Sequence, residues 1–249
     1  MPGAEVELSL CKLCVTNPPS AEAHIIPKSM YPFEKPRHEP LRIVASAPEV
    51  PLGKSRVGEY DPNLVCTGCE ARFSPWDDYA IRLFRRAPKN EDYIFVDGKQ
   101  QAYMIHTYDY AKLKLFFVST LWRASETDRP FFANVNVGPR HTKRLREMIL
   151  NSNPGEPEEY SVLIVRFTHP FDAHKAIMTP ERQRYGSDRV LFYRFYLAGY
   201  MSAIKVSQQP TPSIFSRFIL RPNRPLYIVL MRFEDTQDYQ AMVKAVRSR

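Results

Sequence analysis

All four cysteines of this chain fall into two Cys-x-x-Cys pairs, Cys11 with Cys14 and Cys66 with Cys69. Such a turn lets two thiolates reach one ion, and zinc favours four thiolate ligands in a tetrahedron. Two pairs that lie far apart in the sequence would then cross-link the chain through the metal. The pattern therefore predicts one structural zinc ion bound by these four cysteines.

Two other uses of the cysteines are open at this point. They could be ordinary buried thiols, or one pair could be a redox site, although the strand–helix context of thioredoxin-like proteins is missing. No apolar run is long enough to span a membrane, and residues 1–10 lack the basic flank of a secretory signal. We therefore expect a cytoplasmic protein that does not enter the membrane, in which disulfides are unusual.

The chain has a formal net charge of +8, and the first 86 residues are neutral overall, so the basic excess lies beyond them. A basic surface favours contact with phosphates, and we expect nucleic acid as the partner, DNA rather than RNA. A basic protein with no such partner would have the same composition. The aromatic-rich C-terminal half could instead contact a protein partner or a second copy of the chain.

The spacing of apolar residues predicts an α+β protein. We expect an N-terminal zinc-stabilised module over 1–88 and a mixed α+β substrate- or partner-binding domain over 89–249. Between Tyr31 and Pro62 proline is frequent, which predicts loop with at most short strands. The predicted helices run from the second cysteine pair to Pro88, over Tyr108–Ala124 and over His141–Leu150. The predicted strands are Tyr93–Val96, Gln101–His106, Tyr160–Phe167, Val190–Phe195, Ala203–Val206, Ile214–Leu220 and Leu226–Phe233.

Two stretches of the sequence carry a further pattern. They are Ala23-His24-Ile25-Ile26-Pro27-Lys28, and Asp61-Pro62-Asn63-Leu64-Val65 followed by Cys66-Thr67-Gly68-Cys69-Glu70. Together they resemble the HNH nucleases, in which a histidine begins a His-Ile-x-Pro pattern and Asn-Leu-Val precedes the second cysteine pair. Over about residues 9–150 the chain is also similar to uncharacterised bacterial proteins described as HNH endonucleases.

The resemblance implies a ββα-metal, treble-clef-like fold for the N-terminal module, and hydrolysis of phosphodiester bonds in nucleic acid. His24 would be the general base, because a neutral imidazole can accept a proton near neutral pH, and Asn63 would orient the hairpin or the histidine. Glu70, with Asp77 two helical turns later, would bind a catalytic Mg²⁺ or Mn²⁺. By analogy with the family, such a nuclease would serve bacterial, antiviral defence.

The chain departs from the family pattern at two positions. Ala23 stands where the family has an acidic residue, and Glu70 stands where it has histidine or asparagine. A catalytically inactive zinc module is therefore the alternative, one that binds nucleic acid or protein, or serves as a subunit of a larger complex. In that case His24 would be a packing histidine, Glu70 an acid favoured at a helix start, and Asp77 a solvated helix acid.

Several basic residues are candidates for contact with nucleic acid. Arg123 follows the apolar part of a predicted helix, where an arginine can bind a phosphate, cap the last helix carbonyls or pair with an acid. A second group lies at the start of the third predicted helix and could equally be a solvated face. The candidates are Lys28, Arg123, Arg140, Lys143 and Arg144.

Overall fold

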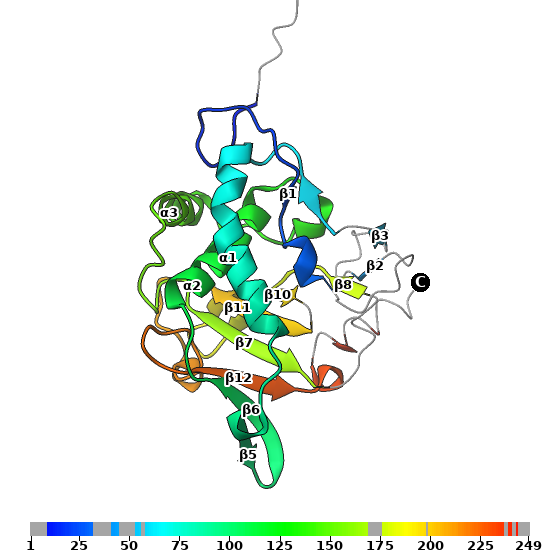
Figure 1. Ribbon diagram of the computed structural model, residues 1–249, viewed down its shortest axis with the longest axis vertical. Coiled ribbons are helices and arrows are strands. Elements are labelled where there is room, and N and C mark those ends of the chain that lie inside the picture. Colours follow the sequence, from blue (N-terminus) through cyan, green and yellow to red (C-terminus); the bar gives the residue numbers. More distant parts are fainter. Residues whose placement is uncertain are drawn as a thin grey trace, which may run out of the picture.

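The computed structural model describes residues 9–31, 41–44, 53–55, 58–168, 176–197, 199–236, 239–240 and 243. Within them the chain is α+β, as predicted, with helices beside a large mixed sheet (Figure 1). The helices are α1 (Thr67–Arg85), α2 (Tyr110–Glu126) and α3 (Pro139–Leu150), each close to its predicted range. None of the described helices is long and apolar enough to cross a membrane.

The large sheet has seven strands in the order β5-β6-β12-β7-β11-β10-β9. All neighbouring strands are antiparallel except β12 and β7, which are parallel. The β5–β6 hairpin turns at Asp97-Gly98, where both residues have positive φ, at 50° and 72°, as the predicted tight turn requires. The strands are β5 (Tyr93–Val96), β6 (Lys99–Ile105), β7 (Val162–Phe167), β9 (Glu181–Tyr185), β10 (Val190–Leu197), β11 (Tyr200–Lys205) and β12 (Leu226–Met231).

One predicted strand is wrong. Residues 214–220 form no strand, and their first part is a 3-10 turn, Ser213–Phe215. Pro212 precedes this segment as the N-cap residue of that turn. The aromatic and aliphatic side chains of the segment, including Phe215 and Ile219, pack instead on the sheet face that carries Phe192 and Met201.

Two small sheets lie near the N-terminal half. Strand β1 (Ala23–His24) pairs antiparallel with β4 (Tyr60–Asp61), so the end of the stretch predicted as loop lies beside a strand that precedes this stretch. The other sheet has the order β3-β2-β8, with bounds Gly53–Ser55, Leu41–Val44 and Ala176–Met178. Residues 32–40, 45–52 and 56–57 of the proline-rich stretch lie outside the described residues.

The main hydrophobic core is continuous from Cys11 to Ile228. It contains α2 residues such as Phe116 and Trp122, α1 residues such as Phe73, and sheet residues from β7 to β12. The described residues therefore have no separate core on each side of residue 88. The division into a module over 1–88 and a domain over 89–249 stays a prediction.

Lys114 of α2 is fully buried, and its Nζ donates to the carbonyl oxygen of Glu159 at 2.6 Å. Burial lowers the pKa of this amine to about 7. An unfolded lysine titrates near 10.4, so between these two values the unfolded chain binds more protons and stability rises with pH. We expect the free energy of unfolding of the protein to gain up to about 1.4 kcal/mol per pH unit from about pH 7 upward, relative to Lys114→Met. Urea denaturation of both proteins at pH 7 and 9 measures this gain, and parallel pH profiles would contradict it.

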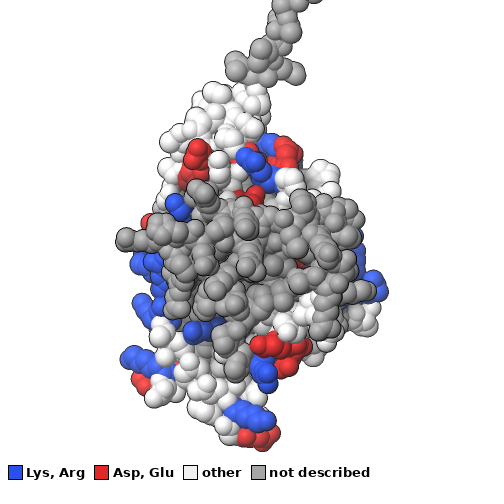
Figure 2. All heavy atoms as spheres, turned by 90° about the vertical axis from the view of Figure 1, so that its right-hand side faces the viewer, with Lys and Arg blue, Asp and Glu red and all other residues white. Residues whose placement is uncertain are grey.

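Figure 2 shows one face of the molecule, on which the visible lysine and arginine side chains lie in scattered groups beside acidic ones. The nucleic-acid partner expected from the charge stays a prediction.

Candidate metal centre and its surroundings

The four cysteines come together at one point. Their Sγ atoms all lie within 4.8 Å of one another, and the Sγ atoms of Cys14 and Cys66 are 3.9 Å apart. A tetrahedral zinc site with Zn–S distances of about 2.3 Å requires S–S separations of about 3.8 Å. The cluster is therefore consistent with a structural Zn²⁺, as predicted.

The backbone positions the two pairs before any metal is considered. Cys66 is the N-cap residue of α1 and Cys69 lies in the first turn of that helix, where the helix dipole favours negative charge. A hydrogen bond joins the loop of Cys11 and Cys14 to the segment just before Cys66. The backbone N–H of Lys12 donates to the carbonyl oxygen of Leu64 at 2.9 Å. Two distant parts of the chain are thus joined beside the thiols.

The electrostatics of the cluster favour a cation. The backbone N–H of Asn17 is the main cause that lowers the pKa of the Cys14 thiol, to about 6. Burial, followed by the neighbouring sulfur atoms, raises the pKa of the Cys69 thiol well above its ordinary value. Four thiols at this distance cannot all ionise unless a positive charge offsets their repulsion, and a bound metal ion supplies it.

The β1–β4 ladder places His24 next to α1. His24 is paired in register with Tyr60, and Ala23 with Asp61, five residues before Cys66. Asp61 is buried and accepts hydrogen bonds from the backbone of Asn63 at 2.9 Å and from Thr127 Oγ1 at 2.6 Å. These bonds fix the turn that leads from β4 to the second cysteine pair and α1.

Arg123 of α2 connects this ladder to α1. Its Nη1 donates to the carbonyl oxygen of His24 at 2.7 Å and to Asp77 Oδ2 at 3.1 Å, and its Nη2 donates to Asp77 Oδ1 at 2.9 Å. The guanidinium also lies 4.7 Å from the centre of the Phe73 ring. The side chain of Arg123 is 0% exposed. Of the roles expected for Arg123, the structure shows the pairing with an acid, and the donors of its side chain are used inside the protein.

Glu70 lies in the first turn of α1, close enough to Arg123 and Asp77 for their charges to act on it. Burial is the main cause that raises the pKa of its carboxyl group. Its Oε2 atom is buried and has no hydrogen-bond partner among the described residues. Both oxygens of Asp77, in contrast, accept from Arg123. Of the two carboxylates predicted to bind a catalytic ion, Glu70 has the unsatisfied oxygen.

The remaining predicted residues lie apart from this group. The side chain of Asn63 is exposed, and no hydrogen bond that the structure describes connects it to His24. Lys28 is exposed at the start of a short 3-10 helix. On α3, Arg140 and Lys143 are exposed, whereas Arg144 pairs with Glu159 at 2.7 Å.

The sequence pattern did not identify Asp77 as the partner of Arg123. Removing one partner of a buried ion pair leaves the other charge without compensation. We expect Arg123→Met to lower the free energy of unfolding by about 3–5 kcal/mol, measured by urea denaturation. Arg123→Met combined with Asp77→Leu should recover part of this loss. A change below about 1 kcal/mol in the single variant would mean that the pair does not hold α2 to α1.

No family model, no curated protein and no solved structure matches this chain.

Proposed function

We propose that this protein is a metal-dependent nuclease of the HNH-like, ββα-metal type, with His24 as its general base. One observation carries the proposal. Strand β1, which holds His24, pairs with β4, and β4 leads within five residues into the cysteine pair that begins α1. The order strand, strand, helix, joined at a four-cysteine cluster, is the arrangement that a treble-clef-like nuclease module would need.

His24 has the chemistry and the support for the role of a base. A neutral imidazole can take a proton from water near pH 7, so that the resulting hydroxide attacks the phosphorus atom. The main chain at His24 is fixed twice, by the ladder with Tyr60 and by the hydrogen bond from Arg123. A base that takes a proton from the attacking water must be held in position, because a small displacement of the imidazole would lower the reaction rate.

Glu70 is the proposed ligand of a catalytic Mg²⁺ or Mn²⁺. A carboxylate oxygen is a preferred donor for both ions, and the buried Oε2 of Glu70 has no partner among the described residues. When bound, such an ion neutralises charge on the phosphate and on the leaving oxygen. Asp77 has a different part in this proposal: it holds Arg123, which in turn holds the strand of His24.

Binding of Mn²⁺ tests the proposed ligand without relying on catalysis. We expect the zinc-loaded protein to bind one Mn²⁺, detected by electron paramagnetic resonance, and Glu70→Gln to weaken this binding at least tenfold. Asp78→Asn is the matched control, because Asp78 is an exposed acid on the same helix. If Glu70→Gln binds Mn²⁺ like the native protein, Glu70 is not the ligand.

One observation favours a second candidate, a zinc-structured binding module without catalysis. Ala23 is fully buried where the resembling family carries an acidic ligand, and Arg123 already neutralises Asp77 nearby. Such a module would bind nucleic acid or a protein partner, alone or as a subunit of a larger complex. A folded, zinc-loaded protein that binds an oligonucleotide and never cuts it would favour this candidate.

A further inference from the structure

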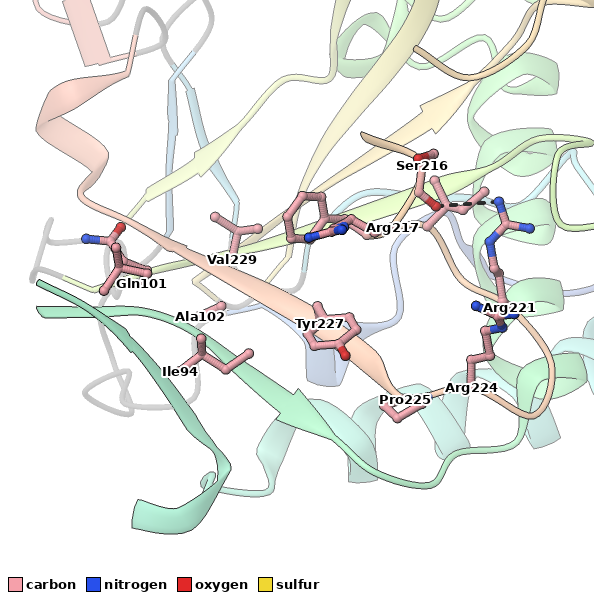
Figure 3. A pocket seen from close by; sticks show the side chains of 13 residues that line it. Ile94, Gln101, Ala102, Ser216, Arg217, Arg221, Arg224, Pro225, Tyr227 and Val229 are labelled. Carbon is pink, nitrogen blue, oxygen red and sulfur yellow. Dashed lines mark hydrogen bonds between the residues drawn. The ribbon is translucent and has the colours of Figure 1, made fainter. Parts of the chain in front are cut away.

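An open groove of about 1240 Å³ lies on the large sheet, far along the molecule from β1 (Figures 1 and 3). Its floor is formed by side chains of β5, β6 and β12, and the segment over 216–225 forms its wall. The cross-strand register puts Ile94, Ala102 and Val229 side by side on this floor. On β12, Leu226 and Ile228 belong to the main core on the other face of the sheet, whereas Tyr227 and Val229 line the groove.

The groove is positively charged. Among the described residues that line it there are three arginines, Arg217, Arg221 and Arg224, and no acidic side chain. Arg221 is paired with Glu158 at 3.1 Å, so part of its charge is offset. Arg217 and Arg224 are exposed and make no ion pair within the described part of the chain. Their positive charge is therefore available to an anionic partner.

The same groove also offers flat, apolar surface. Tyr227 is half-buried, and its ring stands edge-on to Phe218, with ring centres 6.5 Å apart. In Figure 3, Arg221 and Arg224 lie together at one end, and Ile94, Ala102 and Val229 lie toward the other. Cations next to an aromatic ring on a sheet are the elements that proteins use to hold a phosphate backbone and to stack unpaired bases.

We propose that this groove binds single-stranded nucleic acid, with Arg217 and Arg224 on phosphates and a base stacked on Tyr227. A duplex keeps its bases paired and stacked on each other, so only its phosphates could be contacted here. A peptide of acidic residues alone would match the arginines but has no ring to stack on Tyr227. Single-stranded nucleic acid would also be the substrate class of the proposed nuclease, and to that extent the inference rests on the proposed function. Binding to the groove can nevertheless be measured in the absence of cleavage.

The test is binding of a fluorescein-labelled, 12-nucleotide single strand, followed by fluorescence anisotropy at several salt concentrations with no added Mg²⁺ or Mn²⁺. We expect Arg217→Ala with Arg224→Ala to weaken binding at least tenfold. Loss of two phosphate contacts should also make the slope of log affinity against log salt shallower by about 1.4. The control, Arg82→Ala with Arg182→Ala, removes the same charge from exposed positions outside the groove and should change neither value.

Tyr227 separates stacking from charge. Tyr227→Ala should weaken binding by about 5- to 150-fold, whereas Tyr227→Phe, which keeps the ring, should bind like the native protein. Equal losses in the groove variant and the control variant would overturn the proposal, and so would tighter binding of a 12-base-pair duplex or equal binding of polyglutamate. His24→Ala is expected to bind normally, so a failure of the nuclease proposal and a failure of the groove give different results.

Discussion

Replacing His24 by alanine is expected to lower the rate of strand cleavage by about 10²- to 10⁴-fold, the contribution that a general base makes. The variant loses the imidazole that we propose accepts the proton from the attacking water. It keeps the hydrogen bond from Arg123, because Arg123 donates to the main-chain oxygen of residue 24 and not to the imidazole. The fold and the zinc content should therefore remain, and the loss should appear in the rate and not in binding of the strand.

The control for this variant is His106→Ala. His106 has a side chain that is 58% exposed, and it pairs with Asp92 on the β5–β6 side of the molecule. Its removal should leave the cleavage rate within about twofold of the native value. Rates are compared at equal zinc content, with supercoiled plasmid and a circular single strand as substrates. Equal cleavage by His24→Ala and the native protein would mean that the base lies elsewhere, or that the activity comes from a contaminant.

Loss of the zinc ion should unfold the N-terminal part of the chain. In small zinc domains the ion supplies on the order of 10 kcal/mol of folding free energy. Here Cys11, Cys66 and Cys69 are themselves part of the main core, so the cluster and the packing depend on each other. We expect Cys66→Ser to lower the free energy of unfolding by about 5 kcal/mol or more, which corresponds to at least about 10 °C in the melting temperature of a chain of this size.

Val15→Ser is the control for a hydroxyl introduced near the cysteines, because Val15 directly follows Cys14 in the loop of the first pair, is 54% exposed and should tolerate it. Elemental analysis of the native protein should give one zinc per chain. Calorimetry of the native protein, with and without a zinc chelator, should reproduce the destabilisation of Cys66→Ser. A zinc content far below one per chain, or a melting temperature that neither the chelator nor the substitution changes, would contradict the zinc site.

The cysteine cluster and the β5–β6 turn were predictable from the sequence, because each follows from a short motif of residues with a specific chemistry. Four cysteines in two short turns predict their own convergence, and the Asp97-Gly98 turn follows from the backbone freedom of these residues. Residues 214–220 are apolar enough for a strand, but they pack on a face of the sheet where both edges of strand β11 are already paired, with β7 and with β10. Burial against another element and pairing in a ladder leave the same apolar signal in a sequence.

The long-range contacts of the site could not be predicted in the same way. His24, Glu70 and Asp77 were identified as candidates from the residues themselves. The partner of Asp77 is 46 residues away, and nothing in the spacing distinguishes an arginine that grips a phosphate from one that is buried between two helices. Only the packing of α1 against α2 reveals that Arg123 fixes the strand of His24.

The most direct test of the proposed nuclease is a time course of cleavage by the zinc-loaded native protein, with Mg²⁺, with Mn²⁺ and with neither. We predict that plasmid or single-stranded circles are cut only when one of these ions is present. The contradictory result is a folded protein with one zinc per chain that cuts neither substrate with either ion. In that case the cysteine cluster, the β1–β4 ladder and Arg123 would build a binding module and not an enzyme.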